Sequence, residues 1–248
     1  MKITNNSKIP DALFRFLSQD TYDYEGRGDS FSVTELLNPV QMIVLKRRHY
    51  KEIEIEAKDR LWVLLGSGVH RLLEDEEGIE KPERLGISVL GRGVSGKFDR
   101  IFDGKITDYK VTSAFTLMYG DREIEFILQL SLYRYLYYKV KGILLGKHGS
   151  IIALLRDWAE RNVGTHRYPT SNAVELTYKL MSTQETGEWL EHKVSKVIKA
   201  EKLKDEKLPE CTPEERWFNE KKKTYVRCGK YCEASQFCHQ LVREVVHQ

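Results

Sequence analysis

An Asp-Gly pair between two alternating runs of apolar and polar residues is the feature that most constrains how this chain folds. Asp103-Gly104 lies in the middle of residues 94–111. This arrangement predicts a β-hairpin with a two-residue loop, which fixes the register of the two strands. Counting outward from the loop places Asp99 directly opposite Asp108. The sequence therefore predicts two carboxylates that face each other across one hairpin.

Two opposed carboxylates are destabilising unless something holds them together. A divalent cation is one such partner, because hard cations take oxygen ligands. Lys110 lies on the same strand face as Asp108, since side chains two residues apart point the same way. Two carboxylates and a lysine on one face are typical of metal-assisted phosphodiester cleavage. The alternative interpretation is a surface hairpin with solvated charges.

The composition indicates an ordinary globular protein. The chain has 248 residues, of which 41% are hydrophobic and 31% charged, and its formal net charge is +3. This length predicts either one large domain or one domain with a small appendage. The net charge alone does not identify a nucleic-acid partner, but two local basic clusters at residues 46–48 and 221–223 are candidates for phosphate contacts. Solvated faces are the alternative for both.

The hydrophobic periodicity predicts helices and strands in mixed order. Residues 1–30 are expected to be irregular or weakly helical, and Ser32 with Glu35 fits a capping box. Helices are predicted at 33–37, 40–50, 54–76, 121–141 and 183–203, and strands at 84–90, in the hairpin, at 150–156 and at 173–180. This order predicts an α/β fold with a central mixed β-sheet flanked by helices.

Two helices carry polar pairs at one-turn spacing. His70 and Glu74 lie four residues apart on the first long helix, and Gln129 and Tyr133 lie four apart on the second. A lone histidine is more often a packing residue than a ligand. A tyrosine at this spacing is equally typical of a core stripe. These pairs become informative when their order along the chain relative to the hairpin is considered.

Together these motifs resemble the PD-(D/E)XK nuclease superfamily, and in particular its RecB-type branch, which includes phage exonucleases and CRISPR-adaptation nucleases. The family pattern is a helical His, then Gly-x-x-Asp, Asp/Glu-x-Lys and Gln-x-x-x-Tyr. The matching residues here are His70, Gly96 to Asp99, Asp108 to Lys110, and Gln129 to Tyr133. The 32–36 segment is similar to the family's opening, and the likeness spans about residues 30–240. The proline of the motif name is replaced by Phe98, and that proline contributes no ligand.

The resemblance implies a restriction-endonuclease-like core and a Mg²⁺ or Mn²⁺ ion. The implied ligands are His70, Asp99, Asp108 and the backbone carbonyl of Tyr109. Lys110 would orient or deprotonate the attacking water, or neutralise the transition state. Gln129 and Tyr133 would hold the DNA strand or brace the site. Glu74 is expected to support the metal-binding residues without binding the metal itself.

All four cysteines lie near the C-terminal end, at Cys211, Cys228, Cys232 and Cys238. This clustering suggests metal ligation by thiolates, which select zinc or an iron–sulfur cluster. RecB-type relatives often carry an iron–sulfur cluster on three C-terminal cysteines, and the last three cysteines here resemble those. Cys211 or His239 would serve as the fourth ligand. The alternative is four free thiols. We expect residues 1–205 to form the nuclease core and 206–248 a cysteine-containing tail packed on it.

The functional expectation is a Mg²⁺- or Mn²⁺-dependent deoxyribonuclease, an exonuclease of recombination and repair or of phage DNA metabolism. DNA and a recombination protein are the expected partners. An endonuclease on the same fold, an RNA-directed nuclease and a non-catalytic DNA-binding scaffold are the alternatives. The polar N-terminal residues and the lack of a run of about 18 apolar residues predict no signal peptide and no membrane helix. The expected compartment is the cytoplasm of a bacterium or a phage-infected host.

Overall fold

The computed structural model describes residues 1–19, 28–73, 82–120, 122–220 and 222–246. The chain divides into two compact units, which are described separately. The sheet unit comprises residues 30–37 and 62–190, and the helical unit comprises residues 1–29, 38–61 and 191–248. The predicted α/β class is confirmed, with parallel and antiparallel strands flanked by helices.

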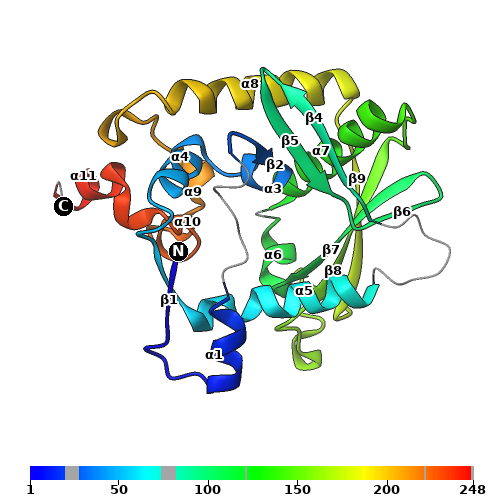
Figure 1. The fold of residues 1–248 in the computed structure, drawn as a ribbon. Coiled ribbons are helices and arrows are strands. Elements are labelled where there is room, and N and C mark those ends of the chain that lie inside the picture. Colours follow the sequence, from blue (N-terminus) through cyan, green and yellow to red (C-terminus); the bar gives the residue numbers. More distant parts are fainter. Residues whose placement is uncertain (20–27, 74–81, 121, 221, 247–248) are drawn as a thin grey trace. The chain divides into compact units, whose positions relative to one another are not determined.

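Seven strands form two sheets in the sheet unit (Figure 1). They are β2 (Phe31–Ser32), β4 (Arg84–Val89), β5 (Arg92–Lys97), β6 (Arg100–Phe102), β7 (Lys105–Thr112), β8 (His148–Leu155) and β9 (Ala173–Lys179). The strand orders are β2-β5-β4 and β6-β7-β8-β9. The β2–β5 and β7–β8 pairs are parallel and the others antiparallel. The central position of β7 and β8 explains why both strands are rich in apolar residues.

The predicted hairpin is present, with the predicted register at its tip. Ile101 pairs with Ile106 on β6 and β7, and both loop residues have positive φ, 48° at Asp103 and 66° at Gly104. These angles are typical of the two-residue loops that Asp-Gly pairs favour. The prediction of one continuous first strand is wrong, because the chain bends at Asp99 and β5 pairs with β4 instead. The single expected sheet is therefore divided in two.

The sheet unit also contains the helices α3 (Val33–Leu36), α5 (Leu61–Leu73), α6 (Ala114–Tyr119), α7 (Glu123–Lys141) and the first part of α8 (Thr183–Ala200), with a 3-10 turn η2 (Glu160–Asn162). Helix α3 contacts β2 and β5. Helix α7 contacts β4, β5, β7 and β8, and its buried side chains include Leu130 and Leu136. The Ser32 hydroxyl caps α3 by accepting the Glu35 N–H, as predicted.

The prediction of a helix over 54–76 is wrong at its start. Residues 54–60 form β3 (Glu54–Glu56) and a 3-10 turn η1 (Ala57–Arg60), and α5 begins only at Leu61. β3 pairs in parallel with β1 (Lys2–Thr4), so a long-range strand partner overrides the local helical pattern. Helix α6 was missed, although Ser113 caps its start and Gly120 ends it with a φ of 67°.

The helical unit contains short elements around α4 (Val40–Arg48). The others are α1 (Asp11–Leu17), η3 (Asp205–Lys207), α9 (Pro213–Arg216), β10 (Phe218–Asn219), β11 (Thr224–Tyr225), α10 (Val226–Lys230), η4 (Ser235–Phe237), α11 (His239–Val246), the end of α8, and β1, β3 and η1. The predicted domain boundary at residue 205 differs from this division, because residues 191–205 cluster with the tail and with 38–61. In the described part of the chain, no helix is both long and apolar enough to cross a membrane.

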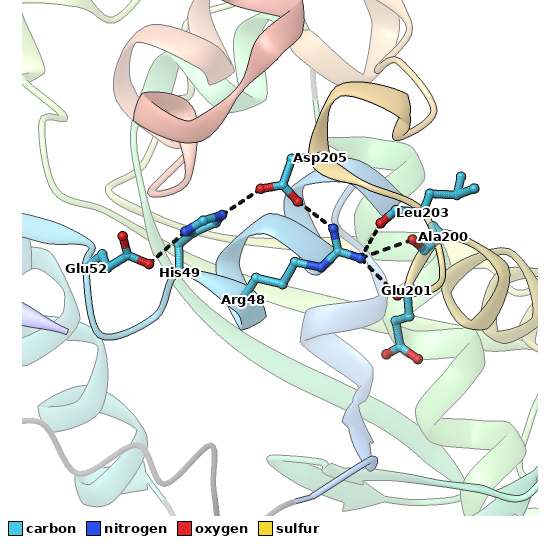
Figure 2. A network of polar contacts seen from close by, with 7 residues as sticks. All are labelled: Arg48, His49, Glu52, Ala200, Glu201, Leu203 and Asp205. Atoms are coloured by element: carbon cyan, nitrogen blue, oxygen red, sulfur yellow. Dashed lines mark hydrogen bonds and ion pairs between the residues drawn. The ribbon is translucent and has the colours of Figure 1, made fainter.

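The basic cluster at the end of α4 is a structural element of the helical unit. Lys46 forms an ion pair with Glu233 in the tail. Arg48 donates to Asp205 at 2.5 Å and to the last carbonyls of α8 and the turn after it, those of Ala200, Glu201 and Leu203 (Figure 2). These contacts satisfy carbonyl groups that a helix C-terminus leaves without partners. Lys46 and Arg48 therefore contact other parts of the helical unit, and phosphate binding by this cluster stays a prediction.

His49 continues this network toward the C-terminal segment. Its ring nitrogens contact Glu52 at 2.8 Å and Asp205 at 2.7 Å, as Figure 2 shows. The ring also stacks on Phe237, with centroids 4.0 Å apart. Burial of the ring lowers its pKa, but the hydrogen bonds to Asp205 and Glu52 outweigh burial, so the His49 pKa is raised above its usual value.

The His49 contacts predict a pH-dependent stability. A raised histidine pKa stabilises the fold fully below about pH 6.5, and this contribution is lost as pH rises through the raised value. We expect the melting temperature of the wild type to fall between pH 6.5 and 8. His49→Phe keeps an aromatic ring against Phe237 but removes the charge, so its melting temperature should change less over that range. Equal pH dependence in both proteins would contradict the assignment.

Candidate functional site

The sheet unit brings the predicted catalytic residues into one connected network. Asp99 lies in the bend between β5 and β6 and is 6% exposed. Its Oδ1 lies 2.9 Å from His70 Nδ1 on α5, and its Oδ2 accepts the backbone N–H of Tyr109 at 2.9 Å. The bend that interrupts the predicted strand thus turns the Asp99 carboxylate onto β7, where Asp108 lies.

Asp108 is held from two sides. It is 2% exposed, and its Oδ2 lies 2.6 Å from the Lys110 ammonium on the same face of β7. Its Oδ1 accepts a hydrogen bond from the Gln129 amide at 3.0 Å. The same amide lies 3.0 Å from the Tyr133 hydroxyl, one turn further along α7. His70 on α5 therefore contacts Asp99, and Gln129 on α7 contacts Asp108.

Burial and neighbouring charges shift the pKa values of the groups in this network. Burial is the main cause that raises the pKa of Asp108, and the charge of Asp99 raises it further. Lys110 lowers it, and the pKa of Asp108 is about 6. The hydrogen bond to Asp99 raises the His70 pKa, although burial works against it. Burial also raises the Tyr133 pKa, so its hydroxyl stays protonated. A divalent cation would relieve the repulsion between the two buried carboxylates.

Gly96 of the predicted motif has a packing role. A Cβ atom built on Gly96 would lie 2.7 Å from Tyr133 Cε1 and 2.9 Å from Val33 Cγ2. Such distances require a shift of the ring or the backbone. The glycine therefore lets α7 approach β5 closely enough for Tyr133 to reach the network around Asp108.

The donor chemistry at this site fits Mg²⁺ or Mn²⁺. Magnesium sites in proteins use one or two carboxylates and complete their coordination with water and substrate phosphate. Asp108 Oδ2 lies 2.6 Å from the Lys110 ammonium, so a metal ion at this oxygen would share it with Lys110. Within the described residues, no group of three or more His, Cys, Asp or Glu side chains is placed so that it could hold a metal ion. The metal contact predicted for the Tyr109 carbonyl stays a prediction, and Glu74 lies outside the described residues.

A second candidate site lies in the helical unit, where all four cysteines line one pocket. Cys211 Sγ and Cys238 Sγ lie 3.5 Å and 3.4 Å from the same atom, Oε1 of Gln41. Burial raises the pKa of Cys211 to about 12 and that of Cys232 to about 11. Without a metal these thiols are therefore protonated and poor nucleophiles.

The surroundings of the cysteine pocket are cationic. Arg216 and Arg227 line it and are 3% and 7% exposed, and Arg216 Nε donates to Cys228 Sγ at 3.4 Å. Lys193 interacts electrostatically with Cys211, and burial lowers its pKa to about 8. Glu215 lines the same pocket. Thiolates are ligands that zinc and iron–sulfur clusters take, but within the described residues the cysteines do not form a group that could hold a metal ion.

Sequence reasoning missed the polar residues of this pocket. Gln41 stands in the otherwise apolar start of α4 and is 3% exposed. A lone amide within an apolar helical run is a recognisable sign of a buried polar contact. The two arginines carried no such sign, because their burial depends on stacking against Tyr225 and Trp217.

Comparison with known proteins supports the fold. No family model and no curated protein matches the chain. A solved structure described as "Crystal structure of SSO0001" is similar, with a TM-score of 0.51 and 18% sequence identity over 92% of each chain. At this identity the similarity shows a shared fold, and the description of that structure names no activity.

Proposed function

We propose that the protein is a divalent-metal-dependent nuclease that hydrolyses phosphodiester bonds in DNA. The observation that carries the proposal is the network of Asp99, Asp108 and Lys110, in which two buried carboxylates and an ammonium group converge from β7 and the bend before β6. A buried like-charged pair is costly, and such arrangements cluster at functional sites. The motif order described above agrees with a nuclease of the PD-(D/E)XK type.

Each side chain has a role that follows from its contacts. When bound, Mg²⁺ or Mn²⁺ polarises the scissile phosphate and lowers the pKa of water. His70 holds Asp99 in place through the 2.9 Å contact. Gln129 fixes the rotamer of Asp108 and leaves its second oxygen toward Lys110. The Lys110 ammonium is then placed to orient the attacking water and to offset negative charge on the phosphate.

The Lys110 role predicts a separation between metal binding and turnover. Lys110→Ala is expected to lower the cleavage rate by about 10²- to 10⁴-fold. Metal affinity should be retained, because the variant removes a cation beside Asp108 and leaves both carboxylates. Single-turnover cleavage and Mn²⁺ titration on the same preparation measure the two effects. Loss of Mn²⁺ binding in this variant would show that Lys110 acts structurally.

The function is tested with purified protein on end-labelled linear DNA and closed circular DNA, with Mg²⁺, Mn²⁺ or EDTA. We propose exonuclease activity, so linear DNA should be degraded from its ends and circles should persist. Cutting of circles would instead identify an endonuclease on the same fold. DNA binding without cleavage under all metal conditions would favour a non-catalytic scaffold. A parallel RNA substrate tests the choice of nucleic acid.

We also propose that the four cysteines hold a metal that stabilises the helical unit. The proposal is supported by the pocket that all four cysteines line. An iron–sulfur cluster is favoured by the family resemblance, with zinc as the alternative. Iron and zinc analysis of anaerobically purified protein distinguishes the two, and the absence of both would leave four free thiols.

A further inference from the structure

An arginine stacks on a tryptophan in the sheet unit, and neither residue belongs to the candidate active site. Arg156 Cζ lies 4.4 Å from the centroid of the Trp62 ring. Trp62 is 52% exposed, and Arg156 is also exposed. Within the described ranges of the chain, no carboxylate forms an ion pair with Arg156. The pair therefore offers an aromatic face and an available positive charge to a ligand.

The backbone places this pair close to the candidate active site by two routes. Trp62 and His70 lie eight residues apart on α5, which corresponds to about 12 Å along the helix axis. The Arg156 N–H donates to the Thr112 carbonyl at 2.9 Å. Thr112 lies two residues beyond Lys110 on β7, a distance of about 7 Å along the strand. The backbone residues that carry the pair thus lie near the carboxyl end of β7, roughly 7–12 Å along these elements from residues of the site.

A second aromatic pair lies at the same end of β7. Phe115 and Tyr119 on α6 stack with centroids 6.5 Å apart and are 54% and 60% exposed. Asp157, which follows Arg156, accepts the Ala114 N–H at 2.7 Å at the start of α6. This contact ties α6 to the segment that carries Arg156. Exposed aromatic rings and a cation therefore line the same end of the sheet.

The chemistry of this surface fits a nucleic-acid strand. Bases stack on aromatic side chains regardless of sequence, and arginine pairs with phosphate while also stacking on rings. At about 3.4 Å per stacked nucleotide, the distance to the site corresponds to roughly two to four nucleotides.

We propose that Trp62 and Arg156 form a subsite that stacks a base of the bound strand and pairs with its phosphate, roughly two to four nucleotides from the cleaved bond. The proposal rests on the proposed function for the identity of the ligand. It adds a positioning role for two residues that the family motifs do not include. Its test measures binding, so that it does not depend on cleavage.

The experiment measures the anisotropy of a fluorescein-labelled twelve-nucleotide oligothymidylate in EDTA. Trp62→Ala should weaken binding about 5- to 100-fold, and Trp62→Phe should stay within about threefold of the wild type. Arg156→Gln should weaken binding and reduce the slope of log affinity against log salt by about one. Leu72→Ala is the matched control, because Leu72 lies on the same helix and is 80% exposed. This control should bind as the wild type does.

A direct readout is the quenching of tryptophan fluorescence by the oligonucleotide, which should decrease in Trp62→Phe. The subsite would be overturned if Trp62→Ala bound the oligonucleotide as tightly as the wild type does. It would also be overturned if Leu72→Ala lost as much affinity as Trp62→Ala, or if the wild type did not bind. A different measurement, the cleavage rate, tests the proposed function. Normal cleavage by Asp108→Ala would refute the catalytic assignment even if Trp62→Ala weakens binding, whereas abolished cleavage with unchanged Trp62→Ala binding would refute the subsite alone.

Discussion

Asp108→Ala is expected to abolish DNA cleavage, with a loss of about 10³-fold or more in the single-turnover rate. Asp108 supplies a buried oxygen to the proposed cation and is the partner of Lys110 and Gln129. Its removal eliminates a ligand that contributes several kcal/mol of charge stabilisation in the transition state. DNA binding should be retained, because phosphate contacts depend on cations elsewhere on the surface.

The control for this loss is Glu175→Gln. Glu175 is an exposed carboxylate in the sheet unit, on β9, and pairs with Lys105. Its replacement should leave cleavage within about twofold, since exposed ion pairs contribute little. The melting curve of Asp108→Ala shows whether the variant is folded. Wild-type cleavage by a folded Asp108→Ala protein would place the active site elsewhere.

The second large effect is expected in the cysteine pocket. Cys232→Ser should lower the melting temperature by about 10 °C or more, because metal binding at a thiolate site contributes directly to folding. The variant should also lose iron or zinc. Its cleavage rate below the melting temperature should change little, because the soft thiolate ligands differ from the oxygen ligands that a phosphate-cleaving cation prefers.

Ser235→Ala is the matched control for Cys232→Ser. Ser235 lies three residues away in η4, and its substitution removes a hydroxyl while keeping all four thiols. The control should retain both the metal and the melting temperature. A Cys232→Ser protein that is as stable as the wild type, together with metal-free wild-type protein, would leave the cysteines as ordinary thiols.

The local signals in the sequence predicted the parts of the site that depend on neighbouring residues. The Asp103-Gly104 turn gave the register of the hairpin, and two-residue periodicity placed Lys110 beside Asp108. The bend at Asp99 was not predicted, because it depends on the pairing of β5 with β2 and β4. That pairing is long-range, and no pattern within residues 94–102 reveals it.

Long-range contacts also explain the other differences. Residues 54–60 have a helical pattern, but residues 54–56 pair with the first strand of the chain and residues 57–60 form a 3-10 turn. The sequence suggested that the basic residues at the end of α4 contact phosphate. In the structure Lys46 forms an ion pair with Glu233, and Arg48 forms one with Asp205. A charge run shows which groups are present, and only the fold shows which partners they meet.

Direct binding of Mn²⁺ tests the central claim, which is that the carboxylates of Asp99 and Asp108 hold a divalent cation. Isothermal titration of the wild type, Asp108→Asn and Glu175→Gln with Mn²⁺ measures the number of ions bound at this site. Asp108→Asn removes the charge with little change in side-chain size. The expected result is one ion per chain in the wild type and in Glu175→Gln, and none at this site in Asp108→Asn. Unchanged binding in Asp108→Asn, or no binding by the wild type, would contradict the claim.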